Sequence, residues 1–298
     1  MTIDTNPELL PSADDAAAMV REDPSIFALA MRHPSIILGG ALLCVVVLIA
    51  AIGPFMTSDP VALNAMNRLK PPTGVDWFGT DYLGRDIFAR VIHGSKISLV
   101  VGLAVSLCAV SLGLVIGLLA GYIRILDAII MRIMDGLMAI PGILLAIALV
   151  SLSGATLFTV VIAIMIPEIP RVVRLVRAVV LSVREEPYVE AAIASGTKLP
   201  LILTRHILPN TIAPMIVQAT YICASAMLTE AILGFLGAGI PPEIPSWGNI
   251  MAEGRTYFQL TPWIIFYPGI ALAITVLAVN TLGDGLRDTL DPRIARKM

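Results

Sequence analysis

Charged residues are scarce in this chain, and their scarcity excludes an ordinary soluble globular protein. Only 14% of the 298 residues are Asp, Glu, Lys or Arg, whereas 57% are hydrophobic, and the mean hydropathy is +0.87. A soluble core of this size would not bury so much apolar surface. The sequence therefore predicts a membrane protein. The formal net charge of -2 provides no basic field, so we expect no nucleic-acid partner.

Cysteine and nucleotide-binding motifs are also lacking. Cys44, Cys108 and Cys223 all lie in apolar runs, and their spacing resembles neither a metal site nor a disulfide framework. The chain contains no Gly-x-x-x-x-Gly-Lys-Ser/Thr phosphate loop. We therefore expect no metal, no cofactor and no catalytic residue in this chain.

Protease motifs and transporter repeats are missing as well. The sequence has no Gly-x-Ser-x-Gly, His-Glu-x-x-His or Gly-x-Gly-Asp motif, which argues against an intramembrane protease. A secondary transporter, the remaining alternative, often shows an inverted repeat, and none is visible here. Dependence of uptake on an ATPase would separate a secondary transporter from an ATP-driven one.

Long uncharged stretches are what the chain does have. A bilayer core of about 30 Å requires roughly 20 apolar residues per helix. The stretch 136–167 would be about 48 Å long as one helix, too long for a single crossing, and Ser151–Gly154 interrupts it, so it predicts a hairpin of two spans. Six spans result, with both ends on one side. The stretches are 35–58, 97–123, 136–167, 210–236 (interrupted by Glu230) and 256–283.

The distribution of Lys and Arg predicts the orientation. With both ends in the cytoplasm, 14 of the 20 basic residues lie on the cytoplasmic side. The discordant segment 85–96 has apolar residues on one face, and we expect an amphipathic helix in the outer interface. The predicted regions are a cytoplasmic extension (1–34), the first transmembrane helix (35–58), an outer loop with the amphipathic helix (59–96), a five-helix core (97–285) that includes a cytoplasmic loop (182–209), and a cytoplasmic tail (286–298).

The loop 182–209 has strong local signals for two short helices. Glu185-Glu186-Pro187 suits a helix start and Gly196 suits its end. A second helix is expected from Thr197, as its cap, to Leu208, with Pro209 ending it. The small residues that follow Glu190 permit close approach of another surface. The loop therefore reads as a docking element.

Several motifs in one order resemble a known family. Glu190-Ala191-Ala192, then Gly196 and Leu208-Pro209, is similar to the coupling-loop signature of ABC importer permeases. His206 stands where that signature has Ile, as in its peptide and nickel branch. The C-type subunits of that branch (DppC- or OppC-like) are also resembled by Phe78-Gly-Thr-Asp-Tyr-Leu-Gly-Arg-Asp86, Ile130-Met-Arg-Ile-Met-Asp135, Glu230-Ala-Ile-Leu-Gly-Phe-Leu-Gly237 and Asn280-Thr-Leu-Gly-Asp-Gly-Leu-Arg-Asp288.

The resemblance implies an all-α membrane protein with six transmembrane helices, the type I ABC importer permease fold and cytoplasmic termini. It implies import of dipeptides or short oligopeptides across the bacterial cytoplasmic (inner) membrane, with nickel chelates, haem or another small solute as alternatives. The implied partners are a homologous B-type permease, two ATPase domains or subunits that bind ATP and Mg, an extracytoplasmic substrate-binding protein and membrane lipid. The implied ATPase-coupling residues are Glu190, Ala191, Ala192, Gly196, Leu208 and Pro209.

Other residues suggest roles within the membrane. Glu230 is an ionisable group at membrane depth, so it either lines the translocation pathway or ties spans together by a hydrogen bond. Glu168, between two prolines, is expected to form a structural ion pair with Arg171 or Arg174 at the inner end of the fourth span. Small residues at four-residue intervals mark close helix packing rather than a pathway: Gly113, Gly117 and Gly121.

Overall fold

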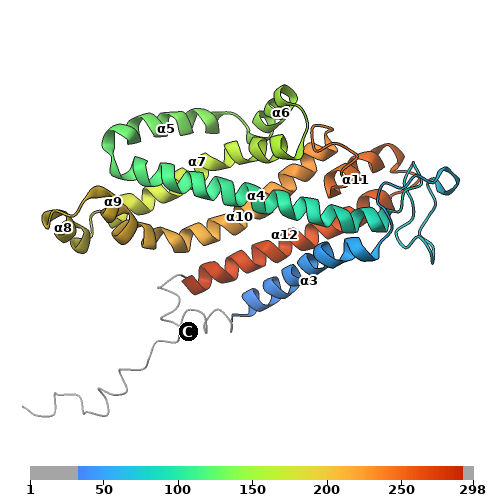
Figure 1. Cartoon of the computed structure of the whole chain (residues 1–298), viewed down its shortest axis with the longest axis horizontal. Coiled ribbons are helices and arrows are strands. Elements are labelled where there is room, and N and C mark those ends of the chain that lie inside the picture. The colour runs from blue at the N-terminus through green and yellow to red at the C-terminus, as the bar shows by residue number, and fades with distance from the viewer. Residues whose placement is uncertain (1–32, 291–298) are drawn as a thin grey trace, which may run out of the picture.

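The computed structural model describes residues 33–290, and that part of the chain is built almost entirely of helices. Within it, the only β-type pairing is an isolated bridge between Thr80 and Asp86. The longer helices lie side by side along the long axis of the molecule (Figure 1). The elements are α3 (Pro34–Met56), η2 (Ala65–Asn67), α4 (Ile87–Tyr122), α5 (Arg124–Ala139), α6 (Gly142–Ser153), α7 (Leu157–Val183), α8 (Pro187–Ala194), α9 (Leu199–Leu201), η3 (Ile202–Ile207), α10 (Leu208–Phe235), α11 (Trp247–Gly254), η4 (Arg255–Tyr257) and α12 (Trp263–Leu290).

Four helical segments of the described part are long and apolar enough to cross a membrane, and a fifth is counted if α5 and α6 form one broken span. The four are α3, α4, Leu199–Phe235 and α12. Helix α7 has 27 residues, about 40 Å at ~1.5 Å per residue, but its second half carries several arginines. The expected count of six is therefore not established by length and composition.

The predicted hairpin of two spans over residues 136–167 is wrong in its first arm. Helix α5 ends at Ala139, α6 begins at Gly142, and their axes differ by 89°. Pro141 explains the bend, because proline lacks an N–H and disfavours helical geometry in the preceding residue, Ile140, which is extended. The predicted break at Ser151–Gly154 is present, since α6 ends at Ser153 and α7 begins at Leu157.

The amphipathic interfacial helix expected over residues 85–96 is not a separate element. Asp86 caps a helix that begins at Ile87 and continues without a break to Tyr122, and the Asp86 side chain accepts a hydrogen bond from the backbone N–H of Phe88 at 2.9 Å. Burial also differs from the prediction, since Ile87 and Arg90 are almost fully covered by protein. The apolar face of this segment therefore packs against the molecule rather than lying in lipid.

Helix α4 packs along α7 through the three glycines at four-residue spacing. A Cβ atom added at Gly113, Gly117 or Gly121 would lie 2.5, 2.7 or 2.6 Å from the Cβ atom of a valine on α7. These valines, at positions 172, 176 and 180, are buried. The two backbones can approach this closely only because the glycines have no side chain, which is the packing role expected from the sequence.

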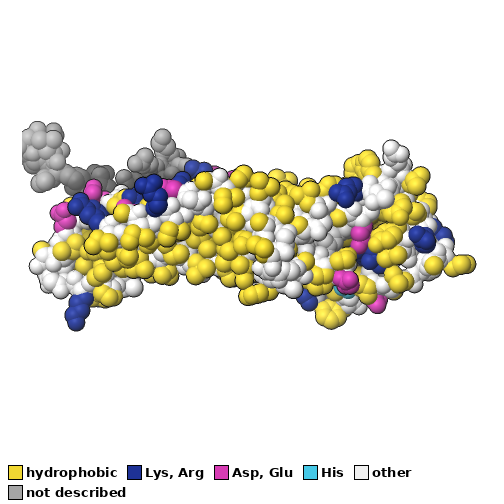
Figure 2. All heavy atoms as spheres, turned by 90° about the horizontal axis from the view of Figure 1, so that it is seen from above, with side chains coloured by type: hydrophobic (Ala, Val, Ile, Leu, Met, Phe, Trp, Pro, Cys, Tyr) yellow, Lys and Arg dark blue, Asp and Glu magenta, His cyan; other side chains and the backbone are white. Residues whose placement is uncertain are grey.

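The surface and the helix ends agree with a membrane-spanning bundle. Figure 2 shows hydrophobic side chains over the middle of the visible face and charged side chains gathered toward its two ends. The start of α3 and the end of α12 lie close together, with His33 Nε2 and Asp288 Oδ2 3.8 Å apart. The start of α3 and the end of α12 both lie toward the end of the molecule that carries α8 (Figure 1). Most of the expected extension (1–34) and residues 291–298 of the tail are outside the described residues.

Candidate functional site

Helix α8 projects at one end of the molecule, where the charged loop was expected to form a short helix (Figure 1). Pro187 occupies its first turn, where the missing N–H costs no hydrogen bond, and Glu190 also lies in that turn. At its end, the N–H of Thr197 bonds to the carbonyl of Ala192 at 3.1 Å and the N–H of Gly196 to that of Ile193 at 2.9 Å. This pair of bonds is a Schellman motif.

Gly196 closes that motif with a φ of +78°, as its expected position at the helix end implies. The positive φ is the reason for glycine here, because an added Cβ atom would meet no neighbouring atom within 4 Å. A substitution would therefore strain the backbone without creating a clash. The angle between α8 and the following segment depends on this residue.

The second half of the loop 182–209, which we call the elbow, differs from the prediction. Thr197 caps no helix: Lys198 is the N-cap residue of α9, and α9 continues directly through the π-helical turn η3 into α10. Pro209 does not end the helix, because it lies in the first turn of α10. Proline clashes with the carbonyl four residues before it, and the wider π turn relieves that crowding. The elbow is thus joined to α10 without a flexible break.

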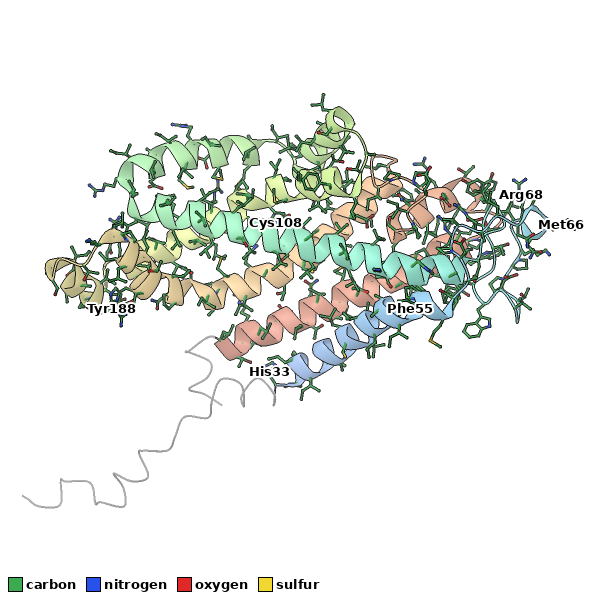
Figure 3. All side chains as sticks on the ribbon, viewed as in Figure 1. His33, Phe55, Met66, Arg68, Cys108 and Tyr188 are labelled. Carbon is green, nitrogen blue, oxygen red and sulfur yellow. The ribbon has the colours of Figure 1, made fainter. Side chains whose placement is uncertain are left out.

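Contacts between α8 and α10 hold the elbow in place. Val189 is fully buried in a core cluster that includes Val180 and Ile207. The side-chain amide of Asn210 donates to the Tyr188 hydroxyl at 3.1 Å and to the carbonyl of His206 at 2.8 Å. Tyr188, labelled in Figure 3, lies at this end of the molecule. The sequence held no signal for the Tyr188–Asn210 contact, since it joins residues that are 22 apart.

The outward surface of the elbow is exposed and consists largely of small residues. Glu190, Ala191 and Gly196 are exposed, and Ala192 is partly covered. A shallow groove beside them is lined by Ser195–Lys198 and by Pro200, Leu201 and Thr204. Within α8, Val189 is the only residue classed as buried. A helix that buries only one of its residues against its own chain is suited to pack against another protein.

Glu230 lies further along α10 and is fully enclosed by the chain. Its exposed fraction is 0%, and its Oε2 accepts a hydrogen bond from the Ser98 hydroxyl of α4 at 3.2 Å. Its other oxygen, Oε1, is buried without a hydrogen-bond partner among the described residues. The geometry therefore favours the structural tie over the pathway role, the two interpretations left open by the sequence.

The charged residues of α7 are distributed differently from the expectation. Arg177 and Arg174 pair with acidic residues of α5, with Arg177 Nη2–Asp127 Oδ2 at 2.7 Å and Arg174 Nη2–Asp135 Oδ1 at 2.7 Å. Glu168 pairs with Arg171 at 3.0 Å, as expected, but it lies near the middle of α7 and not at the inner end of a span. The reason is that α7 continues past the arginines to Val183.

The opposite end of the molecule holds a buried ionic cluster that sequence reasoning missed. The carboxylate of Asp81 accepts hydrogen bonds from Arg85 at 2.6 Å and from Arg90 at 2.8 Å. Both arginines also bond to Glu253 of α11. The signal available in the sequence was two arginines among apolar residues, which require acidic partners when buried. The sequence could not show which acids these were.

Comparisons with known proteins agree with the resemblance. Residues 113–296 match the family model described as binding-protein-dependent transport system inner membrane component. The chain is 55% identical to the probable peptide ABC transporter permease protein of Sinorhizobium fredii, over 92% of this chain and 94% of that protein. It is 42% identical to the dipeptide transport system permease protein DppC of Alkalihalophilus pseudofirmus, over 95% and 94%. It is 43% identical to the glutathione transport system permease protein of Pectobacterium atrosepticum, over 75% and 74%.

Proposed function

Because this chain belongs to the family of binding-protein-dependent transport system inner membrane components, we propose that it is one permease subunit of an ATP-driven importer of dipeptides or short oligopeptides. The names of its relatives support a peptide substrate. The glutathione permease among them favours short peptides in general over one particular dipeptide. Nickel chelates, haem or another small solute remain the alternatives.

The observation that carries this proposal is the exposed helix α8, which a short turn at residues 195–198 connects to the continuous helical segment Leu199–Phe235. The end of α8 is closed by a Schellman motif at Gly196, and the Tyr188–Asn210 bond ties its start to α10. A force applied to α8 is therefore transmitted to a helix that is long and apolar enough to cross the membrane. The surface of α8 around Glu190 docks an ATPase subunit, and Ala191 and Ala192 permit close seating.

The proposed topology has six membrane crossings with both ends in the cytoplasm of a bacterium. These are α3, α4, the broken span α5–α6, α7, α10 and α12. Helix α7 is included because it is about 40 Å long and its arginines on the α8 side would lie at the membrane surface. Because α3 starts and α12 ends at the same end of the molecule, an even number of crossings is supported.

The subunit acts within a larger assembly. It supplies half of the pathway, and a homologous B-type permease supplies the other half. Two ATPase domains or subunits bind ATP and Mg, since this chain has no phosphate loop. An extracytoplasmic binding protein delivers the substrate to the end formed by residues 57–86 and α11.

The test is purification of the tagged chain from native membranes, followed by uptake in reconstituted vesicles. We expect a homologous permease and ATPase subunits to co-purify, and uptake of a radiolabelled dipeptide to require ATP and the binding protein. Glu190→Lys is expected to reduce recovery of the ATPase subunits, whereas Glu243→Lys, at an exposed position outside the α8 elbow, is the matched control. Active transport by this chain alone would contradict the proposal and favour a secondary transporter.

A further inference from the structure

A pocket of about 240 Å³ lies where α5, α6, α7 and α10 meet. Glu168 and Arg171 of α7 and Thr229 of α10 provide its polar groups. The bend between α5 and α6, at Ile140 and Gly142, forms the opposite wall. Broken helices at membrane depth are tolerated where they are covered by protein or line a cavity, and this bend lines one.

The two charged residues of the pocket are placed differently. Glu168 is only 8% exposed, and its two oxygens accept hydrogen bonds from Arg171 at 3.0 Å and from the Ser225 hydroxyl at 3.3 Å. The side chain of Arg171 is 47% exposed, and its guanidinium lies 5.4 Å from the centre of the Tyr221 ring. Both carboxylate oxygens of Glu168 therefore have a partner, while the Arg171 guanidinium is the more accessible of the two charged groups.

The position of the pair within α7 is also informative. Glu168 follows Leu157, the first residue of α7, by about 16 Å along a helix of about 40 Å. Ionisable groups at such depth are costly to insert, and they mark substrate pathways more often than mere scaffolding. Arg174 and Arg177, about one and two turns nearer the α8 end of α7, pair instead with Asp135 and Asp127 of α5.

The pocket is incomplete within this chain. Small-molecule sites usually enclose about 300–1,000 Å³, somewhat more than is found here. Two apolar residues of its lining are themselves exposed, Met138 at the end of α5 and Ile140 in the bend. A second permease seated on these residues would close the pocket and place it between the two subunits.

We propose that Glu168 and Arg171 contact the peptide as it passes, with Arg171 pairing with the terminal carboxylate and Glu168 with the terminal ammonium. This inference rests on the proposed function, which makes the substrate a short peptide. A free dipeptide carries one group of each sign, no more than about 7 Å apart, so one pocket can receive both ends. Charge-assisted hydrogen bonds from a guanidinium to a carboxylate are among the strongest in proteins.

The first test compares two arginines of α7 in the complete reconstituted complex. Arg171→Gln should lower uptake of a radiolabelled dipeptide about tenfold, while ATP hydrolysis stimulated by the binding protein stays within about twofold of wild type. Arg174→Gln is the control, because Arg174 has a similar exposure but pairs with Asp135 instead. Uptake by Arg171→Gln equal to that of the control would overturn the inference.

A charge exchange distinguishes a substrate contact from a structural pair. Glu168→Arg combined with Arg171→Glu preserves the ion pair but reverses its direction. A structural pair would regain both thermal stability and uptake, and that result would overturn the inference; a substrate contact would regain stability but not uptake. Arg171→Lys, which keeps the charge at the exposed position, should take up more dipeptide than Arg171→Gln whether or not the exchanged variant assembles. ATP-independent uptake by the wild-type complex would instead count against the proposed function.

Discussion

Arg90 and Glu253 lie 163 residues apart in the sequence, yet their side chains form a two-pronged ion pair. Arg90 Nη1 lies 2.5 Å from Glu253 Oε2, and Nη2 lies 3.1 Å from Oε1. Arg90 is 1% exposed, so its charge has almost no access to solvent. With Arg85 and Asp81, the cluster contains two positive and two negative groups. It joins the beginning of α4 to α11.

The cluster predicts a large stability loss when one negative charge is removed. Glu253→Gln would leave two buried arginines facing the single carboxylate of Asp81, and breaking a buried pair in this way costs about 3–5 kcal/mol. We expect the thermal unfolding midpoint of the purified complex to fall by about 5 °C or more. Glu243→Gln, at an exposed position before α11, is the matched control. Equal midpoints for the two variants would contradict the structural role of the cluster.

The proposed topology predicts opposite labelling at two exposed positions. Val75, 89% exposed in the segment between α3 and α4, should react as Val75→Cys with an impermeant thiol reagent added outside intact cells. Lys198→Cys, beside α8, should react only after the membrane is opened. The background should lack Cys44, Cys108 and Cys223, and opened cells provide the reference for full labelling. The reverse pattern would invert the whole assignment of sides.

Local features of the site were predictable from the sequence, and contacts across the fold were not. Pro187 and Gly196 determine the ends of α8 through missing N–H and positive φ, and both effects act within a few residues. The Tyr188–Asn210 bond depends on how α8 folds back on α10, which no periodicity encodes. Likewise, five uncharged stretches could be counted and read as six spans, but the bend at Pro141 depends on one residue inside an uncharged run.

The α4–α7 contact predicts opposite effects for alanine at two helical glycines. At Gly117 a Cβ atom would lie 2.7 Å from Val176 Cβ and 3.0 Å from the backbone oxygen of Val173. Neither atom can move away without shifting the backbone of α7. At Gly136 of α5 a Cβ atom would meet nothing within 4 Å. Gly117→Ala should therefore destabilise the protein by about 1–3 kcal/mol, through overpacking. Gly136→Ala should be neutral or stabilising by up to about 1 kcal/mol, through helix propensity.

Thermal unfolding midpoints of the two purified variants test this pair. Each variant introduces the same methyl group into a helix. A difference between their unfolding midpoints therefore comes from the packing around each site and not from the substitution itself. A lower midpoint for Gly136→Ala than for Gly117→Ala would contradict the close packing of α4 on α7.

The enclosure of Glu230 predicts a loss of stability without a change in transport per complex. Glu230→Ala would remove the acceptor of the Ser98 hydroxyl and leave a cavity, whereas Glu230→Gln keeps an oxygen in place. We expect the alanine variant to assemble poorly and the glutamine variant to assemble nearly normally. Uptake is then normalised to the amount of assembled complex. A reduced normalised uptake by Glu230→Gln would show instead that this carboxylate takes part in the pathway.

The elbow predicts that strain at Gly196 uncouples ATP hydrolysis from transport. Valine at a φ of +78° costs about 1–3 kcal/mol, and because no atom lies within 4 Å of its Cβ, the strain is relieved by re-aiming α8 rather than by moving a neighbour. The spans are not touched, so insertion into the membrane should be normal. Gly196→Val should abolish ATP-driven uptake, either because the ATPase subunits dissociate or because they hydrolyse ATP without transport.

Gly154→Val is the control for this prediction, because Gly154 has a φ of +82° and its Cβ would also meet nothing within 4 Å, but it lies in the turn between α6 and α7. Gly154 has a ψ of 150°, a region that is almost exclusive to glycine, so valine there carries at least as large a backbone penalty as at Gly196, but away from α8. Uptake and binding-protein-stimulated ATP hydrolysis are measured in vesicles and normalised to inserted protein. If only Gly196→Val loses coupling, the cause is the direction in which α8 points and not strain as such. Wild-type coupling in both variants would mean that α8 transmits no force to α10.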